Sequence, residues 1–262
     1  MESLLYTGGG LAFVFFMTCL GAASVFFFKK PITVKFRQIF LGFAAGIMIA
    51  ASIWGLLIPS LEESKESSLP DWLPVILGFV LGIGFLLGLD RIIPHFHQSS
   101  NLQEGRSSSS KRSTLLLSAV LLHNIPEGIA VGLAFALVSQ QDGSAAMYAS
   151  AIALALGIGI HNLPESATIS LLFRHEGMPA LKSFLLGCLA GAVDLAFAVI
   201  TIFLASWLIP AMPWLLSFAA GAMMYVVVEE LIPEANLGKH SHAGTLSVMA
   251  GFLLMILLEV VI

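Results

Sequence analysis

The feature that most constrains the fold is a series of long apolar windows that together cover almost the whole chain. A helix needs about 20 apolar residues to cross the hydrocarbon core of a bilayer, and the sequence offers eight such windows. They are residues 4–28, 38–61, 72–93, 114–138, 146–173, 182–208, 213–233 and 243–262. The sequence therefore predicts an all-α membrane protein with eight transmembrane helices in a single domain, residues 1–262.

The composition excludes several other classes of protein. Of the 262 residues, 58% are hydrophobic and 11% are charged, whereas about 25% are charged in a typical soluble domain. A soluble chain of this size cannot bury so much apolar surface in one core. The formal charge of −4 argues against nucleic acid as a partner. Cys19 and Cys188 are the only two cysteines and lie in apolar runs, so we expect no disulfide framework.

The basic residues are distributed unevenly among the connectors between the windows. Eleven of the twelve lie in or beside connectors one, three, five and seven, and only Lys65 lies on the other side. Because lysine and arginine are retained on the cytoplasmic side of a membrane, we expect the odd-numbered connectors to be cytoplasmic. Both termini are then outside.

Two sets of internal repeats favour a transporter, although small residues such as those of the first set also recur in membrane helices simply because they allow close packing. The sequence Phe-Ala-Ala-Gly occurs at 43–46 and 218–221, and Leu-Ile-Pro follows it at 57–59 and 231–233. His-Asn-x-Pro-Glu occurs at 123–127 and 161–165. The members of each pair are an odd number of windows apart and so run in opposite directions, as in inverted-topology repeats. Transporters built in this way bind substrate near the middle of the bilayer.

The His-Asn-x-Pro-Glu motifs place potential metal ligands on helix faces. Histidine and glutamate at i and i+4 lie on one face, which pairs His123 with Glu127 and His161 with Glu165. Pro126 and Pro164 each remove a backbone N–H, so we expect a kink and local unwinding at both positions. That unwinding is expected to turn Asn124 and Asn162 inward as well.

A third acid, Asp194, lies at the middle of the sixth window. Three ionised carboxylates at mid-bilayer cost several kcal/mol each unless they are paired, and no lysine or arginine lies in the middle of any window. Protonation is one solution, but the neighbouring histidines favour one or two divalent metal ions bridged by Glu127 and Glu165. Nitrogen and oxygen ligands suit Zn²⁺, Fe²⁺, Co²⁺, Ni²⁺ or Mn²⁺.

These residues resemble the ZIP family of divalent-metal transporters, whose hallmark is the paired His-Asn-x-Pro-Glu motif. Ile232-Pro233-Glu234 is most similar to the GufA-type bacterial branch of that family. The resemblance implies a first metal position formed by His123, Glu127, His161 and Glu165. It implies a second formed by Asn124, Asn162 and Asp194 with the two glutamates as bridges. It also implies inward transport, a homodimer and a bacterial inner membrane as the location.

Further polar residues are candidates for the release path toward the cytoplasm. Glu229 and Glu230 lie about one turn inside the end of the seventh window, and Met223 lies one to two turns before them. Positions similar to Glu229 and Glu230 form an inner release site in the family, although acids can also reach toward the interface from a helix end. Met223 is a candidate soft ligand on this path or an ordinary adaptable packing residue. Two His-x-His pairs, at 95–97 and 240–242, are expected to catch released metal or to be ordinary loop histidines.

The sequence favours zinc uptake without ATP, with Fe²⁺, Cd²⁺, Mn²⁺ and Co²⁺ as other possible substrates. No Gly-x-x-x-x-Gly-Lys-[Ser/Thr] loop is present for nucleotide binding. The main alternative is an intramembrane carboxylate-bridged metalloenzyme, because such metal pairs also occur in di-iron enzymes. No further nucleophile or acid–base candidate supports that alternative, so we expect a transporter and not an enzyme. A metal sensor is disfavoured because the soluble parts are small.

Overall fold

The computed structural model describes residues 2–28, 33–65, 69–92, 95–96, 103–104, 112–140, 145–235 and 242–262. Nearly all of them are helical. Within these ranges the extended structure is limited to β1 (His95–Phe96), which pairs antiparallel with β2 (Gln103–Glu104).

The helices of the first half are α1 (Glu2–Ala22), α2 (Ser24–Phe27), α3 (Val34–Ala50), α4 (Ile58–Ser64), α5 (Trp72–Ile92) and α6 (Arg112–Gln140). Those of the second half are α7 (Ala145–His175), α8 (Ala180–Leu208), α9 (Met212–Val226), α10 (Ile232–Ala235) and α11 (Ala243–Val261). Wide π-helical turns join α3 to α4, at η1 (Ala51–Leu57), and α9 to α10, at η3 (Val227–Leu231). A 3₁₀ turn, η2 (Ile209–Ala211), joins α8 to α9.

Six segments of the described chain are long and apolar enough to cross a membrane, and the protein is therefore a helical membrane protein. They are Leu4–Phe27, Val34–Ser64, Trp72–Ile92, Val120–Ser139, Ala180–Ala235 and Ala243–Val261. The number is smaller than the eight expected from the sequence, so the count of eight crossings stays a prediction. Ala180–Ala235 contains two long helices, α8 and α9, in 56 residues. Helix α7 has 31 residues, but its middle carries the polar residues of one His-Asn-x-Pro-Glu motif.

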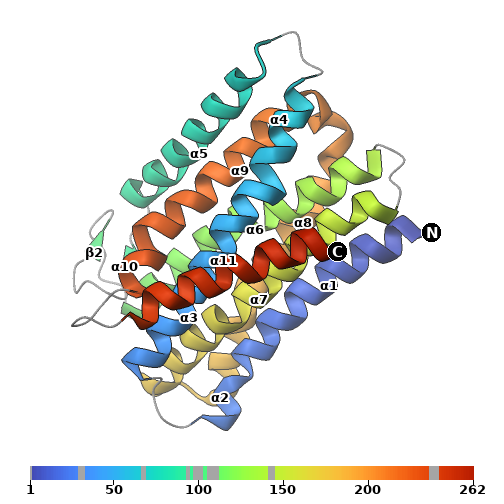
Figure 1. Cartoon of the computed structure of the whole chain (residues 1–262). Coiled ribbons are helices and arrows are strands. Elements are labelled where there is room, and N and C mark those ends of the chain that lie inside the picture. The colour runs from blue at the N-terminus through green and yellow to red at the C-terminus, as the bar shows by residue number, and fades with distance from the viewer. Residues whose placement is uncertain are drawn as a thin grey trace.

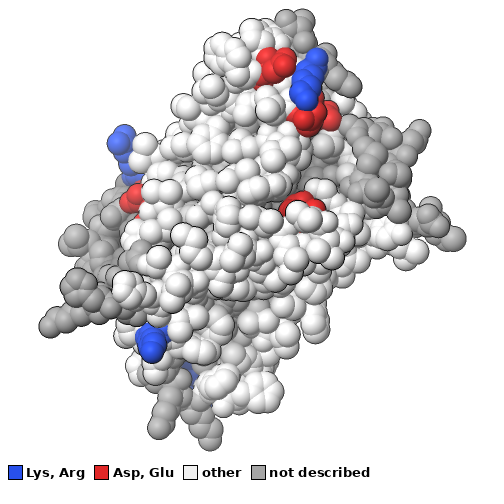
Figure 2. All heavy atoms as spheres, viewed as in Figure 1, with Lys and Arg blue, Asp and Glu red and all other residues white. Residues whose placement is uncertain are grey.

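The long helices form one bundle in which successive helices run up and down (Figure 1). Both ends of the chain lie at the same end of this bundle. The surface shown in Figure 2 is mostly free of charge along its flank, and most of the described charged side chains lie toward its ends. Large apolar side chains such as Phe203 and Trp207 are more than 80% exposed, as expected for a surface that faces lipid.

The helices pack in two reciprocal sets of pairs. Helix α3 lies along α11 and α5 along α9, while α1 lies along α7 and α6 along α8. Glycines allow the first two pairs to approach closely, because an added Cβ would overlap a backbone carbonyl of the partner helix. The overlaps are Gly46 with Val248, Gly251 with Phe43, Gly82 with Phe218 and Gly221 with Phe79. Close backbone approach of this kind is typical of helix packing in membranes.

The two π-helical turns occupy equivalent places in the Leu-Ile-Pro repeats. Turn η1 ends two residues before Pro59, and η3 ends two residues before Pro233. A π turn changes the direction in which the following side chains point, and such turns are frequent at functional sites. The second of them carries Glu229 and Glu230.

Candidate metal site

The two His-Asn-x-Pro-Glu motifs lie within α6 and α7 and face the interior of the bundle. His123, Asn124 and Glu127 on α6 are buried, as are His161 and Asn162 on α7. Asp194 on α8 is 2% exposed. The side chain of Glu165 is 13% exposed. The histidines, asparagines and glutamates of the two motifs and Asp194 therefore lie inside the protein.

Pro126 and Pro164 do not unwind their helices, contrary to our expectation. Both α6 and α7 continue through the proline as α-helix. One missing N–H removes a single backbone hydrogen bond, and the packing of neighbouring helices can maintain the helix on either side. The asparagines are buried on these continuous helices, while the wide turns occur at η1 and η3.

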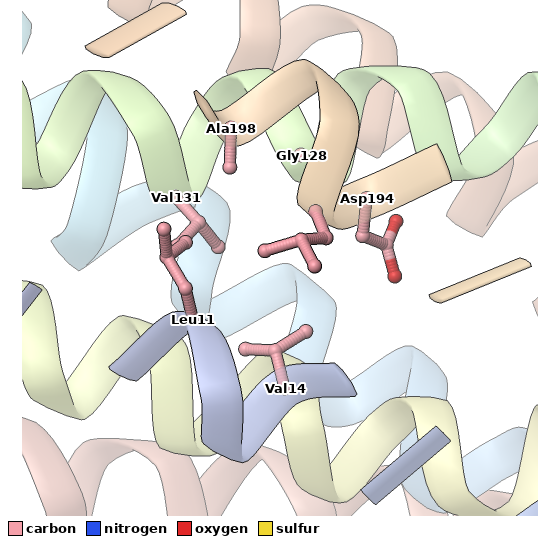
Figure 3. Close-up of a pocket in the computed structure, with 7 residues that line it drawn as sticks. Leu11, Val14, Gly128, Val131, Asp194 and Ala198 are labelled. Carbon is pink, nitrogen blue, oxygen red and sulfur yellow. The ribbon is translucent and has the colours of Figure 1, made fainter. Parts of the chain in front are cut away.

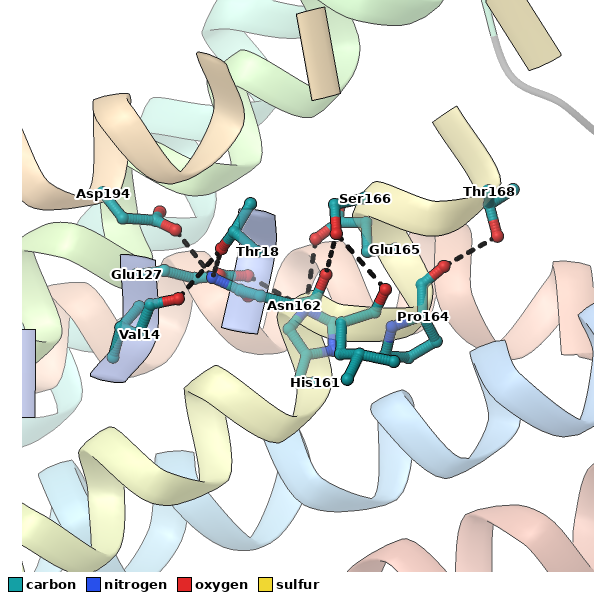
Figure 4. Close-up of polar contacts among 11 residues, drawn as sticks. Val14, Thr18, Glu127, His161, Asn162, Pro164, Glu165, Ser166, Thr168 and Asp194 are labelled. Atoms are coloured by element: carbon teal, nitrogen blue, oxygen red, sulfur yellow. Dashed lines mark hydrogen bonds and ion pairs between the residues drawn. The ribbon is translucent and has the colours of Figure 1, made fainter. Parts of the chain in front are cut away.

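A compact cluster of potential ligands forms where the two motifs meet. One ligand atom each of Glu127, His161 and Glu165 lies within 4.8 Å of the other two. The Nε2 atom of His161 is 3.2 Å from Glu127 Oε1 and 3.5 Å from Glu165 Oε2 (Figure 4). One imidazole thus lies between two carboxylates from different helices.

His123, the remaining histidine of the motifs, contacts Glu230 on η3. Its Nε2 atom is 3.1 Å from Glu230 Oε1, and the Glu230 side chain is 18% exposed. The structure therefore places Glu230 next to His123, a predicted metal ligand. From the sequence, Glu230 was expected farther along the release path. Glu229 is exposed, and Met223 is fully buried in the apolar core.

Asn162 and Asp194 form a separate polar group on the other side of the cluster. The Nδ2 atom of Asn162 donates to Asp194 Oδ2 at 2.7 Å and to Thr18 Oγ1 at 3.3 Å (Figure 4). Thr18 is on α1 and was not among the residues selected from the sequence. A single threonine within an apolar run offers no signal, because its partner Asn162 is 144 positions away.

The site contains an unusual concentration of unsatisfied polar atoms. Buried side-chain atoms without a hydrogen-bond partner include both amide atoms of Asn124 and one atom each of four neighbours: Glu127 Oε2, His161 Nδ1, Asn162 Oδ1 and Asp194 Oδ1. Buried polar atoms are nearly always hydrogen-bonded in proteins. Most of these atoms are oxygens with free lone pairs, so the donor set is suited to cations.

Apolar side chains pack beside Asp194 on the side of the bundle where both termini lie. A cavity of about 10 Å³ is lined by Asp194 and by six other residues: Leu11, Val14, Gly128, Val131, Leu195 and Ala198 (Figure 3). This volume is about enough for one water molecule. Asp194 itself is 2% exposed, so it is almost fully buried beside this cavity.

Of the two His-x-His pairs, only His242 has a described side chain. The side chains of His95, His97 and His240 lie outside the described part of the chain. His242 is described and is exposed.

The fold and the site together define a helical membrane protein with a buried His/Glu cluster of metal-ligand type. The profile of the family described as "ZIP Zinc transporter" matches residues 99–259. The chain is 30% identical to human "Zinc transporter ZIP11" over 96% of this chain and 95% of the relative. It is 32% identical to "Zinc transporter ZIPB" of Bordetella bronchiseptica, with 96% and 79% covered. It is 33% identical to "Zinc transporter GufA" of Myxococcus xanthus, with 84% of each chain covered.

The chain belongs to the ZIP family of zinc transporters. The family resemblance expected from the sequence is therefore confirmed, and the relatives include a bacterial GufA protein. Because the family consists of transporters, the protein is a transporter and not an enzyme.

Proposed function

We propose that this protein carries zinc ions across a membrane toward the cytoplasm, through the buried cluster of α6, α7 and α8. The observation that carries the proposal is the convergence of Glu127, His161 and Glu165 within 4.8 Å, inside a helical membrane protein. Zn²⁺ is commonly bound by imidazole nitrogen and carboxylate oxygen. Family membership supports zinc as the cargo.

The ligands divide into two groups that could hold cations at neighbouring positions. The first group contains both nitrogen and oxygen donors, and the second contains only oxygen donors. The first comprises His123, Glu127, His161 and Glu165, and the second Asn124, Asn162 and Asp194, with the two glutamates between them. Fe²⁺, Co²⁺, Cd²⁺ and Mn²⁺ are candidate competitors at such mixed sites, since selectivity depends on geometry and metal supply.

Glu230 is part of the proposed route on the cytoplasmic side. Its contact with His123 must be exchanged for contacts with the cargo when zinc occupies the first position. A carboxylate held next to the departing ion is a suitable next ligand, because water is scarce at this depth. Glu229 and Met223 stay candidates for the same route.

The proposed topology has eight crossings, with both termini outside and the odd-numbered connectors cytoplasmic. The alternating directions of the helices and the common end of the two termini support it. So does the uneven distribution of basic residues. The 56-residue segment Ala180–Ala235 would extend about 84 Å as one helix, far more than one bilayer needs. We further propose a bacterial inner membrane as the location and a homodimer as the assembly.

The reciprocal helix pairs support the proposal of inverted repeats. In such a repeat α3 corresponds to α9, and α11 corresponds to α5. The α3–α11 pair then has the α9–α5 pair as its counterpart. Gly46 and Gly221, the last residues of the two Phe-Ala-Ala-Gly repeats, make the equivalent close contact in each pair. Such architectures place a substrate between the repeats, where the His/Glu cluster lies.

Zinc uptake into liposomes that contain the purified full chain tests the function. We expect His161→Ala to reduce the initial zinc flux by more than about tenfold, because even residues that only support a metal ligand contribute 10–100-fold. His175→Ala is the matched control, since His175 is on the same helix but exposed in its last turn. Wild-type protein that binds zinc without moving it would contradict transport, and equal losses in both variants would contradict the site.

A further inference from the structure

We propose that Thr18 on α1 is a positioning residue that fixes the amide of Asn162, so that Asn162 Oδ1 is available to the cargo. This inference rests on the proposed function, because it assigns Asn162 an oxygen ligand's role. It adds to the site a helix that carries neither motif.

The hydrogen bonds define the orientation of the Asn162 amide. Its Nδ2 atom carries two hydrogens, and both are used: one is donated to Asp194 Oδ2 and the other to Thr18 Oγ1. The Oδ1 atom is left buried and without a hydrogen-bond partner. An amide oxygen in that state is a ready ligand for a divalent cation.

The Thr18 hydroxyl has a defined direction of its own. It donates to the backbone carbonyl of Val14 at 3.1 Å, which commits its hydrogen and leaves its lone pairs to accept from Asn162. Thr18 is completely buried. A Cβ on Gly191 of α8 would lie only 2.8 Å from Thr18 Oγ1, so the absence of a side chain at Gly191 leaves room for this hydroxyl.

Asp194 alone cannot keep the amide in place through a transport cycle. When Asp194 binds a cation, its oxygens turn to the metal and its bond to Asn162 weakens. Thr18 is no metal ligand in this arrangement and keeps its bond throughout. A reversed amide would put Asn162 Oδ1 against the Asp194 carboxylate and a hydroxyl whose hydrogen is already donated, which is unfavourable.

The test is the dissociation constant of Zn²⁺ for the detergent-purified full chain, measured by equilibrium dialysis against a chelator-buffered zinc series. Thr18→Val keeps the shape and removes the hydroxyl, and we expect it to weaken zinc binding about tenfold, as loss of a ligand's supporting partner typically does. Thr18→Ser is expected to restore the wild-type value. Unchanged binding in Thr18→Val would overturn the inference.

Thr168→Val is the matched control, because the buried Thr168 hydroxyl donates to the carbonyl of Pro164 at 2.8 Å in the same i to i−4 manner. It should leave the zinc dissociation constant unchanged. In an Asn162→Ala background Thr18→Val should have no further effect, since there is no amide left to orient. An equal loss in both backgrounds would show that Thr18 acts by general packing and would overturn the inference. Thr18→Ala replaces Thr18→Val if the valine variant does not fold.

A measurement without metal separates this inference from the proposed function. The chain has four asparagines, Asn101, Asn124, Asn162 and Asn236, so selective ¹⁵N labelling gives few side-chain amide signals. Thr18→Val should shift the signal that disappears in Asn162→Ala and leave the other three in place, and an unshifted signal would contradict the positioning role. If the wild-type protein binds no zinc, the proposed function is wrong, but the hydrogen bond between Thr18 and Asn162 is not affected by that result.

Discussion

At the scale of single residues, the site is defined by polar groups that have few protein partners. The His161 imidazole lies between two carboxylates, and atoms of Asn124, Glu127 and Asp194 lack hydrogen bonds although they are buried. Burial of such groups is unfavourable unless they are paired. A passing dication supplies positive charge and accepts electron pairs from the oxygens, so the same groups that destabilise the empty protein favour the loaded one.

Glu229 and Glu230 are adjacent in sequence and differ in their surroundings. Glu230→Gln removes the negative charge next to His123 with little change in shape, and we expect zinc flux to fall about tenfold. Glu229→Gln should reduce zinc flux less than Glu230→Gln does, because Glu229 is exposed and forms no described contact with the motif residues. Initial rates in liposomes give the comparison. The opposite ranking would mean that zinc leaves along the surface that Glu229 faces.

At the scale of helices, two local structural features position the site: a π turn and close packing at glycines. The π turn η3 directs Glu230 toward His123 while its neighbour Glu229 is exposed. Glycines bring α3 against α11 and α5 against α9. In a bilayer, apolar side chains gain little from leaving lipid, so close packing of small residues contributes much of the association between helices.

Gly82 and Gly84 on α5 allow this packing to be tested. A Cβ at Gly82 would overlap the carbonyl of Phe218 on α9, whereas a Cβ at Gly84 would meet nothing within 4 Å. We expect Gly82→Ala to destabilise the protein by about 1–3 kcal/mol, as overpacking does, and to lower the thermal midpoint in detergent. Gly84→Ala should keep or raise the midpoint, because alanine favours helix. A stable Gly82→Ala variant would indicate that the α5–α9 contact is looser than described.

At the scale of the whole molecule, the helices form one bundle in which Asp194 is buried, with apolar side chains packed beside it toward the end that holds both termini. Leu11, Val131 and Ala198 lie on that side of Asp194 and line a cavity of about 10 Å³. If that end is outside, as proposed, the described arrangement shields Asp194 from the outer solution. Transport then requires these helices to separate, since packed interiors do not deform continuously.

The proposed topology has a direct test at this scale. Alkaline phosphatase fused after Ile262 is expected to be active in bacterial cells, because this enzyme folds only when exported and the C-terminus is proposed to be outside. A fusion of the same enzyme within the connector 94–111 should be inactive, since that connector carries basic residues. Activity in the second fusion and not in the first would reverse the orientation of the whole bundle.

Much of the site could be found from the sequence because its first elements are local. His and Glu at i and i+4 face the same way on any helix, so the His161–Glu165 pair required no knowledge of the fold. The wide turns were not foreseen, and unwinding was expected at Pro126 and Pro164 instead. A proline identifies a missing N–H, but whether the helix continues depends on what packs around it.

Contacts between distant segments were beyond such reasoning. Thr18 contacts Asn162, which is 144 positions away in the sequence. Glu230 lies in the π turn η3 and contacts His123 on a different helix. The membrane character, the helical state and the ligand types follow from hydropathy and spacing, which are properties of short stretches of chain. Which of Glu229 and Glu230 contacts His123, the role of α1 and the packing beside Asp194 depend on how helices lie against one another. That packing is a property of the assembled bundle, since each helix could bury several of its faces.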